Sequence, residues 1–367
     1  MLRCAGYRVA LALVLLTASP RAVLLAQERT DSAVTTGFGN LRLGGLLQVW
    51  YLENAPGLER TFRIRRTELS LKGTFAQRVG WTVMIDPSRA LDFVRDSAVV
   101  DDSIVVPTVE VNQSSRILQD AYITLDFGES FKLDVGQRKV PLSFEGLRSS
   151  AELKTIDRAL MLSDRARGGD FGDVRDIGVM AHGTITPRID YQAGVFNGLG
   201  ETQNDVTTKG TLAVAARVVV RPGVSGLQLG ASGGLNGRPD TAERRRHPFE
   251  PRSRLGVEGY YQRGRWTAQS ELMAGRDDDE TRLGTYALVA CQITSIAEVV
   301  GRVDLFDPDE SRDDSLLTAK ELDFLLGGNF YLLENHLKLQ ANAIAKTFGD
   351  DGPASRLTLQ FNFQVSW

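Results

Sequence analysis

The sequence predicts an all-β protein, a transmembrane antiparallel β-barrel of about sixteen strands with one long loop folded inward. The first observation behind this prediction is the stretch 357–367, in which every odd position is apolar and every even position is polar. A period of two indicates a strand with one apolar and one polar face. Eleven residues are also enough for a tilted strand to cross a bilayer. Taken alone, this strand would fit the cover of a soluble β-sandwich equally well.

The second observation is that similar segments recur along the chain. The first opens with Leu41, Leu43 and Leu47 on one face, and the second sets Leu69 and Leu71 opposite polar side chains. The predicted strands are 40–52, 61–75, 81–86, 120–127, 131–138, 177–186, 189–196, 212–220, 227–235, 255–261, 266–274, 286–292, 297–306, 322–332, 337–346 and 357–367.

The third observation is that short and long connections alternate between these strands. Short turns lie near Gln77, Gly128, Pro187, Pro222, Gly264 and Glu334. Longer connections separate them, and the longest two are 87–116 and 139–172. Bacterial outer-membrane barrels have short turns at one end and long loops at the other. A sandwich has regular turns without this alternation, so the pattern favours a membrane barrel.

The side chains on the two faces agree with a barrel that holds water. Charges occur in the middle of strands, where a dry core would tolerate them only as pairs. They are Arg66, Lys72, Asp120, Asp134, Arg217, Glu258, Glu271, Arg302, Asp304 and Lys338. Aromatic residues lie near strand ends, as membrane girdles require, although aromatics are common in all strands. They are Tyr51, Trp81, Phe127, Phe131, Tyr191, Trp266, Phe330 and Trp367.

The N-terminus resembles a secretory signal. Arg3 and Arg8 precede a short apolar stretch, and we expect cleavage after Ala26, with Ala22 as an earlier alternative. An uncleaved anchor helix is the competing interpretation. Residues 27–38 are expected to be a flexible segment and residues 39–367 the barrel. Removal of the signal takes away three arginines and no acid, which shifts the formal charge from −3 to −6.

No cofactor or metal is expected from the residue types present. Cys291 is the only cysteine after the signal, so the mature chain has no internal disulfide. The histidines, His182, His247 and His336, are far apart and lack the spacing of metal ligands. A hydrolytic triad would need a histidine beside a serine and an acid, and no such pairing is evident. We therefore expect no enzymatic activity.

Several motifs between the second and sixth predicted strands resemble the phosphate-selective porin O and P family. Their order and spacing match over about 120 residues, and together they are more specific than any single one. The motifs are Phe62-Arg63-Ile64-Arg65-Arg66, Asp120-Ala121-Tyr122-Ile123, Asp134 to Ser143, Ser149-Ser150, Ile156-Asp157-Arg158 and Arg175-Asp176-Ile177-Gly178. The resemblance implies a sixteen-stranded porin of the bacterial outer membrane, usually a homotrimer, which contacts lipid and lipopolysaccharide and takes anions such as phosphate.

The connection 139–172 is the candidate constriction loop, because it is longer than a surface hairpin needs. Arginine and lysine side chains select anions by replacing lost hydration with charge-assisted hydrogen bonds. The candidate anion-binding residues are Arg138, Lys139, Arg148, Lys154, Arg158, Arg165 and Arg167, together with Arg66 on the second strand. The same loop holds five acids, so the alternative is that these bases only pair with acids and hold the loop in shape.

The alternation also places neighbouring arginines on opposite faces. Parity puts Arg66 in the lumen and Arg65 toward lipid, unless Arg65 lies above the membrane or a bulge shifts the register. The leading functional hypothesis is passive diffusion of small anions. The alternatives are a less selective porin for small polar solutes, an outer-membrane barrel that does not transport, and a soluble secreted β protein.

Overall fold

The computed structural model describes most of the chain after residue 32. The described residues are 33–36, 39–55, 58–75, 78–91, 93–96, 99–100, 103–104, 108–111, 117–164, 171–198, 212–235, 252–277, 280–310, 319–349 and 352–367. The predicted signal, residues 1–26, lies outside this range. No helix in the described part is long and apolar enough to span a membrane.

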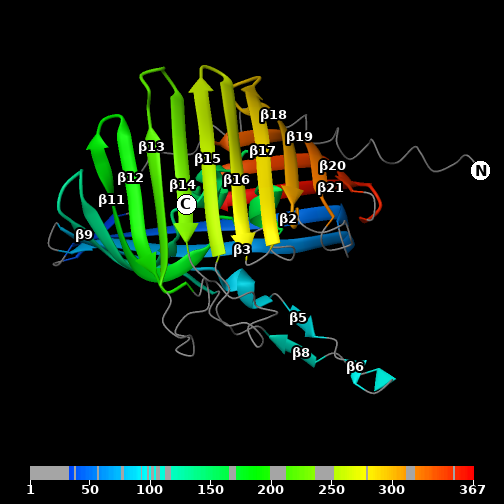
Figure 1. The fold of residues 1–367 in the computed structure, drawn as a ribbon, viewed down its shortest axis with the longest axis horizontal. Coiled ribbons are helices and arrows are strands. Elements are labelled where there is room, and N and C mark those ends of the chain that lie inside the picture. The colour runs from blue at the N-terminus through cyan, green and yellow to red at the C-terminus, as the bar shows by residue number, and fades with distance from the viewer. Residues whose placement is uncertain are drawn as a thin grey trace, which may run out of the picture. The chain divides into compact units, whose positions relative to one another are not determined.

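Sixteen strands form the barrel, in the number and order that the sequence predicts (Figure 1). They are β2 (Gly39–Ala55), β3 (Leu58–Phe75), β4 (Val79–Ile85), β9 (Leu118–Asp126), β10 (Lys132–Lys139), β11 (Arg175–Thr186), β12 (Ile189–Phe196), β13 (Ala213–Val220), β14 (Leu227–Leu235), β15 (Arg252–Arg263), β16 (Trp266–Asp277), β17 (Glu280–Gln292), β18 (Ala297–Asp307), β19 (Glu321–Leu333), β20 (Leu337–Phe348) and β21 (Arg356–Ser366).

Each strand pairs antiparallel with the next along the chain, and the last strand closes the ring on the first. In that closing pair Leu46 lies opposite Ser366 and Glu53 lies opposite Leu359. Closure leaves no free edge along this seam, which is how barrels avoid edge-to-edge aggregation. The predicted fold class, a closed antiparallel barrel of sixteen strands, is therefore confirmed.

The last strand shows the two faces that its alternation predicts. Leu357, Phe361 and Phe363 are exposed on the outside of β21. Asn362 and Gln364 point inward and are buried. Most mid-strand charges predicted for the lumen are likewise buried inside the barrel, among them Asp134, Glu271, Arg302, Asp304 and Lys338.

A β-bulge in β3 changes the face of one arginine. The pairing with β2 runs from Gln48 opposite Arg66 directly to Val49 opposite Ile64, so Arg65 is the extra residue. The inward face therefore moves from even to odd positions at this point. Arg65 stacks over the ring of Trp50, a buried residue of the lumen face, with its guanidinium carbon 5.1 Å from the ring centroid. Of the alternatives for Arg65, the bulge is the one observed.

Two differences from the sequence expectations concern strand ends. Strand β1 (Ala33–Thr36) lies in the segment 27–38, which was expected to be flexible throughout, and it pairs with the start of β2. The start of β2 extends beyond its pairing with β21, which begins at Leu46, and β1 covers this exposed edge. In addition, β16 continues to Asp277 and β17 begins at Glu280, so both strands run further than the predicted ranges 266–274 and 286–292.

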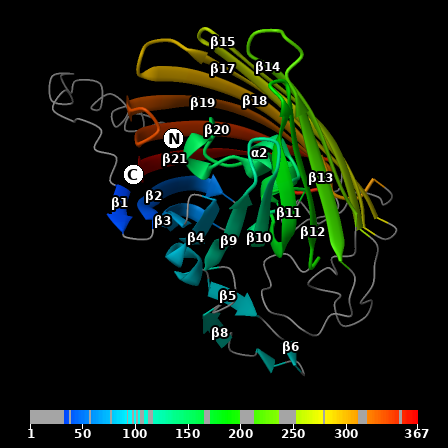
Figure 2. The ribbon, with the colours of Figure 1, turned by 90° about the vertical axis from the view of Figure 1, so that its left-hand side faces the viewer.

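The long connections carry small elements of their own. The connection after β4 contains the 3-10 helix η3 (Pro87–Leu91) and two short hairpins, β5 (Phe93–Asp96) with β8 (Thr108–Val111) and β6 (Val99–Val100) with β7 (Ser103–Ile104). The connection after β10 contains α2 (Phe144–Leu147), the 3-10 helix η4 (Ser150–Glu152) and α3 (Leu160–Ser163). Figure 2 shows α2 within the ring of strands rather than outside it.

Candidate functional site

The segment 140–174, here called the inner loop, leaves β10, crosses the lumen and returns to β11. Its contacts lie on strands far from its own ends. Strand β18 is diametrically opposite β10, since seven strands separate them in either direction around the ring. Hydrogen bonds nevertheless join the inner loop to Arg302 on β18. The loop therefore divides the lumen instead of lining one wall.

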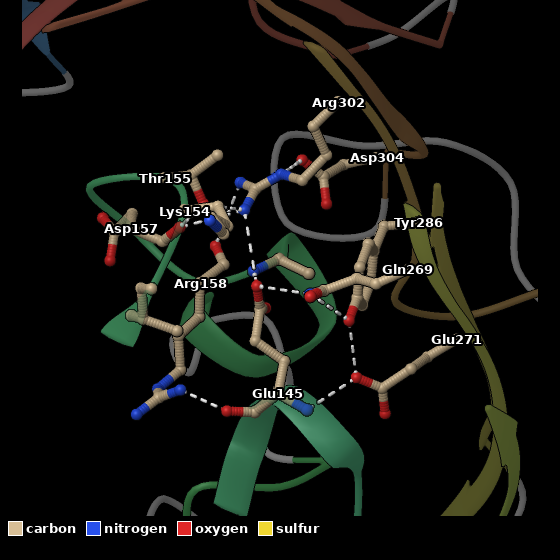
Figure 3. Close-up of polar contacts among 12 residues, drawn as sticks. Glu145, Lys154, Thr155, Asp157, Arg158, Gln269, Glu271, Tyr286, Arg302 and Asp304 are labelled. Atoms are coloured by element: carbon tan, nitrogen blue, oxygen red, sulfur yellow. Dashed lines mark hydrogen bonds and ion pairs between the residues drawn. The ribbon is translucent and has the colours of Figure 1, made fainter. Parts of the chain in front are cut away.

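Glu271 on β16 holds the start of the inner loop. Its carboxylate accepts the backbone N–H groups of Phe144 and Glu145, each at 2.8 Å, and the hydroxyl of Tyr286 at 2.7 Å (Figure 3). The first N–H groups of a helix have no partner within it, so an acid at this position satisfies them. The alternation of β16 allows this contact, because Glu271 lies in the middle of the strand and faces inward where α2 begins.

Arg302 on β18 holds the middle of the inner loop. Its guanidinium donates to the Thr155 hydroxyl at 2.6 Å and to the Asp157 carbonyl at 2.9 Å (Figure 3). It also pairs with Asp304 at 2.6 Å and lies 3.9 Å from the carboxylate of Glu145. All of these groups except Asp157 are buried. The charges at this point of the wall are therefore engaged in structural contacts.

The third attachment involves one lysine of the inner loop and one lysine of the barrel wall. Lys154 of the inner loop pairs with Glu298 of β18 at 2.6 Å, and Asn329 of β19 donates to the Lys154 carbonyl at 2.8 Å. Lys338 of β20 donates to the carbonyls of Ala151 and Leu153 at 2.7 and 3.0 Å. These bonds fix the loop backbone against β18 to β20.

Apolar side chains fill the space between α3 and the opposite wall. Leu160, Met161 and Leu162 of α3 belong to one buried cluster with Tyr286 of β17 and Val300 of β18. Burial of such side chains from water is the main stabilising contribution to packing of this kind. The inner loop is consequently packed against β16 to β19 by a buried apolar core, which also takes in Met180 of β11 and Phe196 of β12.

The other side of the inner loop borders a cavity of about 220 Å³. It lies between the loop and the wall that runs from β3 through η3 and β9 to β11. Its charged lining comprises six cationic side chains and three acidic ones. The cationic residues are Arg65, Arg66, Arg89, Lys139, Arg158 and Arg175, and the acidic residues are Glu68, Asp157 and Asp173. We call this the basic cavity.

Local contacts hold the cations of the basic cavity in place. Arg66 donates to the Gln48 side chain at 2.6 Å, and both are buried. Lys139 pairs with Asp173 at 2.7 Å, and the guanidinium of Arg158 lies 3.1 Å from the same carboxylate. Arg175 pairs with Asp120 at 2.8 Å. Each base is thus oriented by a neighbour, while the bases lining the cavity outnumber its acids.

The predicted anion-binding residues separate into two groups. Arg66, Lys139 and Arg158 line the basic cavity. Arg138 instead pairs with Asp134, Lys154 pairs with Glu298, and Arg148 stacks over Phe144 and Tyr260, with its guanidinium carbon 4.6 and 5.0 Å from the ring centroids. Arg165 and Arg167 lie outside the described residues.

Three further cations join the cavity that were not among the candidates. Arg65 enters through the bulge in β3, Arg175 lies opposite Lys139 in the pairing of β10 with β11, and Arg89 belongs to η3. The possible bulge in the motif Phe62-Arg63-Ile64-Arg65-Arg66 could have identified Arg65. Arg175 belongs to another of the family motifs, Arg175-Asp176-Ile177-Gly178. Nothing in the local sequence distinguishes Arg89, whose position depends on the fold of the connection after β4.

A second cavity of about 350 Å³, here called the lower cavity, lies nearer the short-turn end. Its lining includes Arg42, Lys72, Glu68 and Asp120, which are two bases and two acids, together with the terminal Trp367. Both cavities therefore lie along the wall of β2, β3, β4 and β9. The two cavities line this side of the inner loop with polar and charged side chains.

Comparison with solved structures shows the same fold in outer-membrane channels. An anion-selective porin from Comamonas acidovorans shares 12% identity over 90% of this chain and 100% of that chain, with a TM-score of 0.59. The outer-membrane channel DcaP of Acinetobacter baumannii shares 11% identity over 91% of this chain and 99% of that chain, with a TM-score of 0.61. The trimer form of OmpT, an outer-membrane protein of Vibrio cholerae, shares 11% identity over 90% of this chain and 100% of that chain, with a TM-score of 0.56.

Sequence comparison identifies the family. No curated protein matches the chain. The family model described as phosphate-selective porin O and P matches residues 53–365, which include nearly the whole barrel. The family and the barrel together indicate a channel of the bacterial outer membrane, as the sequence motifs predicted. The chain is a member of the phosphate-selective porin O and P family.

Proposed function

We propose that this barrel lets small anions diffuse across the outer membrane through the basic cavity, with phosphate as one candidate solute. The observation that carries the proposal is the lining of that cavity, where six cationic side chains stand against three acids. Rings of arginine and lysine select anions in channels because their donors replace the hydration that the ion loses. The name of the structurally similar anion-selective porin is consistent with this proposal.

The arginines of β3 are the residues that we expect to matter most. Arg65 and Arg66 are adjacent at the bulge and stand over the same ring, with guanidinium carbons 5.1 and 6.0 Å from the centroid of Trp50. Arginine presents a planar fork of donors that suits oxyanions such as phosphate. The pair therefore supplies charge and directed hydrogen bonds at one level of the route.

The test is the reversal potential of the purified protein in a planar bilayer under a tenfold gradient of potassium chloride. We expect the sign that indicates anion preference, and we expect Arg65→Gln combined with Arg66→Gln to move the potential toward zero. A matched control is Arg263→Gln combined with Arg265→Gln, which removes the same charge from an exposed turn between β15 and β16. Cation preference of the unaltered protein would contradict the proposal.

One observation favours a second candidate, a less selective porin for small polar solutes. The lower cavity has two bases and two acids, so it offers no excess of positive charge to a passing ion. A porin limited by this cavity would show similar permeability to potassium and chloride. Added inorganic phosphate distinguishes the candidates, because phosphate that binds in the basic cavity reduces the chloride current.

The assembly is also a proposal. One structurally similar protein is described as a trimer form, and we propose a homotrimer in contact with lipid and lipopolysaccharide for this chain as well. Sedimentation of the detergent-solubilised protein measures its state of association. A trimeric mass supports the assembly, and a monomeric mass contradicts it without affecting the proposed route.

A further inference from the structure

Glu68 is the one residue that lines both the basic cavity and the lower cavity among those that the structure describes. It lies on β3, and its carboxylate is 3.7 Å from the guanidinium of Arg66. Its side chain keeps 18% of its exposure, so it is neither sealed in the wall nor fully in water. An ion that moves from one cavity to the other passes this carboxylate.

Charged and polar side chains follow one another along the inward face of β3. From the long-loop end, the side chains are Arg66, Glu68, Ser70 and Lys72. Two residues along a strand span about 7 Å and four span about 13 Å. Glu68 therefore stands between the arginines of the basic cavity and the next cation, Lys72, which lies directly across from Arg42 in the pairing of β2 with β3.

Conduction requires that an ion be bound strongly enough to enter and weakly enough to leave. Six cations in a cavity of about 220 Å³ favour a bound anion, and the acids that oppose them are Asp157, Asp173 and Glu68. A carboxylate at the exit raises the energy of the bound anion without removing any donor. On the basis of the proposed function, we propose that Glu68 is the specificity-determining residue that weakens anion binding in the basic cavity and so permits release toward Lys72 and Arg42.

The test compares Glu68→Gln with Glu68→Asp, and chloride is the probe. Single-channel conductance is measured as potassium chloride rises from low to high concentration. For Glu68→Gln we expect the half-saturating concentration to fall about fivefold, since one charge about 7 Å away contributes an effect of that order. Glu68→Asp keeps the charge and is expected to resemble the unaltered protein.

Salt dependence separates a charge effect from an altered shape. The screening length is about 10 Å at 0.1 M salt and about 3 Å at 1 M, so the difference between Glu68→Gln and the unaltered protein should shrink as salt rises. Ser70→Glu adds a second carboxylate on the same face and is expected to raise the half-saturating concentration. That variant tests the proposal even where Glu68→Gln does not insert into the membrane.

The outcomes distinguish this inference from the proposed function. A half-saturating concentration that is unchanged or higher in Glu68→Gln, with anion preference intact in the unaltered protein, overturns the role of Glu68 alone. An effect that persists undiminished at 1 M salt also overturns it, because it indicates a change of shape. Cation preference in the unaltered protein instead contradicts the proposed anion route.

Discussion

The two sides of the inner loop use the same kinds of charged residue for different purposes. On the side of β16 to β20, acids and backbone carbonyls engage the bases that hold the inner loop, as in the pair of Lys154 with Glu298 and the bonds of Arg302 to Asp304 and the loop carbonyls. On the side of β3 and β9 to β11, bases outnumber the acids that line the same cavity. The difference teaches that the number of arginines in a loop does not identify a filter, and we propose that their local balance with acids is the better guide.

The comparison also explains how the inner loop can cross the lumen. A segment of irregular backbone in a lumen needs partners for its N–H and C=O groups. Glu271, Lys338 and Asn329 supply them from the strands. The apolar cluster around α3 then stabilises the same side. The side of β2 and β3 has a smaller apolar cluster, in which Ile156 of the inner loop packs with Trp50 and Leu52 of β2.

The largest effect is expected from Arg302→Ala, which removes the central contact of the anchored side. The substitution leaves Asp304 and Glu145 buried near no compensating guanidinium. Loss of one partner from a buried pair costs about 3–5 kcal/mol. We expect a lower free energy of unfolding in urea, faster cleavage of the inner loop by protease and a larger single-channel conductance, because the released loop no longer divides the lumen.

The control for that experiment is Arg221→Ala. Arg221 pairs with Asp190 near the short turn between β13 and β14, and both side chains are partly exposed, at 39% and 31%. Exposed pairs contribute about 0–1 kcal/mol, so stability and conductance should stay close to those of the unaltered protein. Equal effects of the two substitutions would show that the inner loop is not held by Arg302.

The smallest effect on selectivity is expected from Arg148→Gln combined with Lys154→Gln. Both residues lie in the inner loop and both were candidates for an anion filter, yet Arg148 stacks on Phe144 and Tyr260 and Lys154 is neutralised by Glu298. We expect a reversal potential close to that of the unaltered protein, although stability falls. A shift as large as that of the Arg65 and Arg66 double substitution would erase the distinction between the two sides.

The barrel itself follows from local pattern, because a period of two depends only on which face each residue shows. All sixteen strands were recognisable for this reason, and the closing pair of β2 with β21 is the natural consequence of an even count. For Arg65 the sequence left three alternatives, namely facing lipid, a position above the membrane or a bulge, and the structure shows the bulge. A bulge depends on how a strand pairs with its neighbour, here at Gln48 and Val49, and the isolated sequence of β3 carries no sign of it.

The candidate site was harder to predict because its residues meet across the ring. Lys154 and Glu298 are 144 positions apart, and no local motif in either segment indicates the other. The sequence therefore could not decide between a filter and internal pairing for the bases of the inner loop. The structure brings together Arg66, Lys139 and Arg158, and it accounts for Arg138, Arg148 and Lys154 by other contacts.

The most direct test of the difference between the two sides of the inner loop is reaction with a water-soluble, negatively charged thiol reagent in a Cys291→Ser background. Ser70→Cys places a thiol in the lower cavity, on the proposed route. Val300→Cys places one in the dry core of the anchored side, where Val300 has no exposure. We predict that the reagent modifies Ser70→Cys and blocks its current while leaving Val300→Cys unreacted. Block through Val300→Cys, with Ser70→Cys unaffected, would contradict the account.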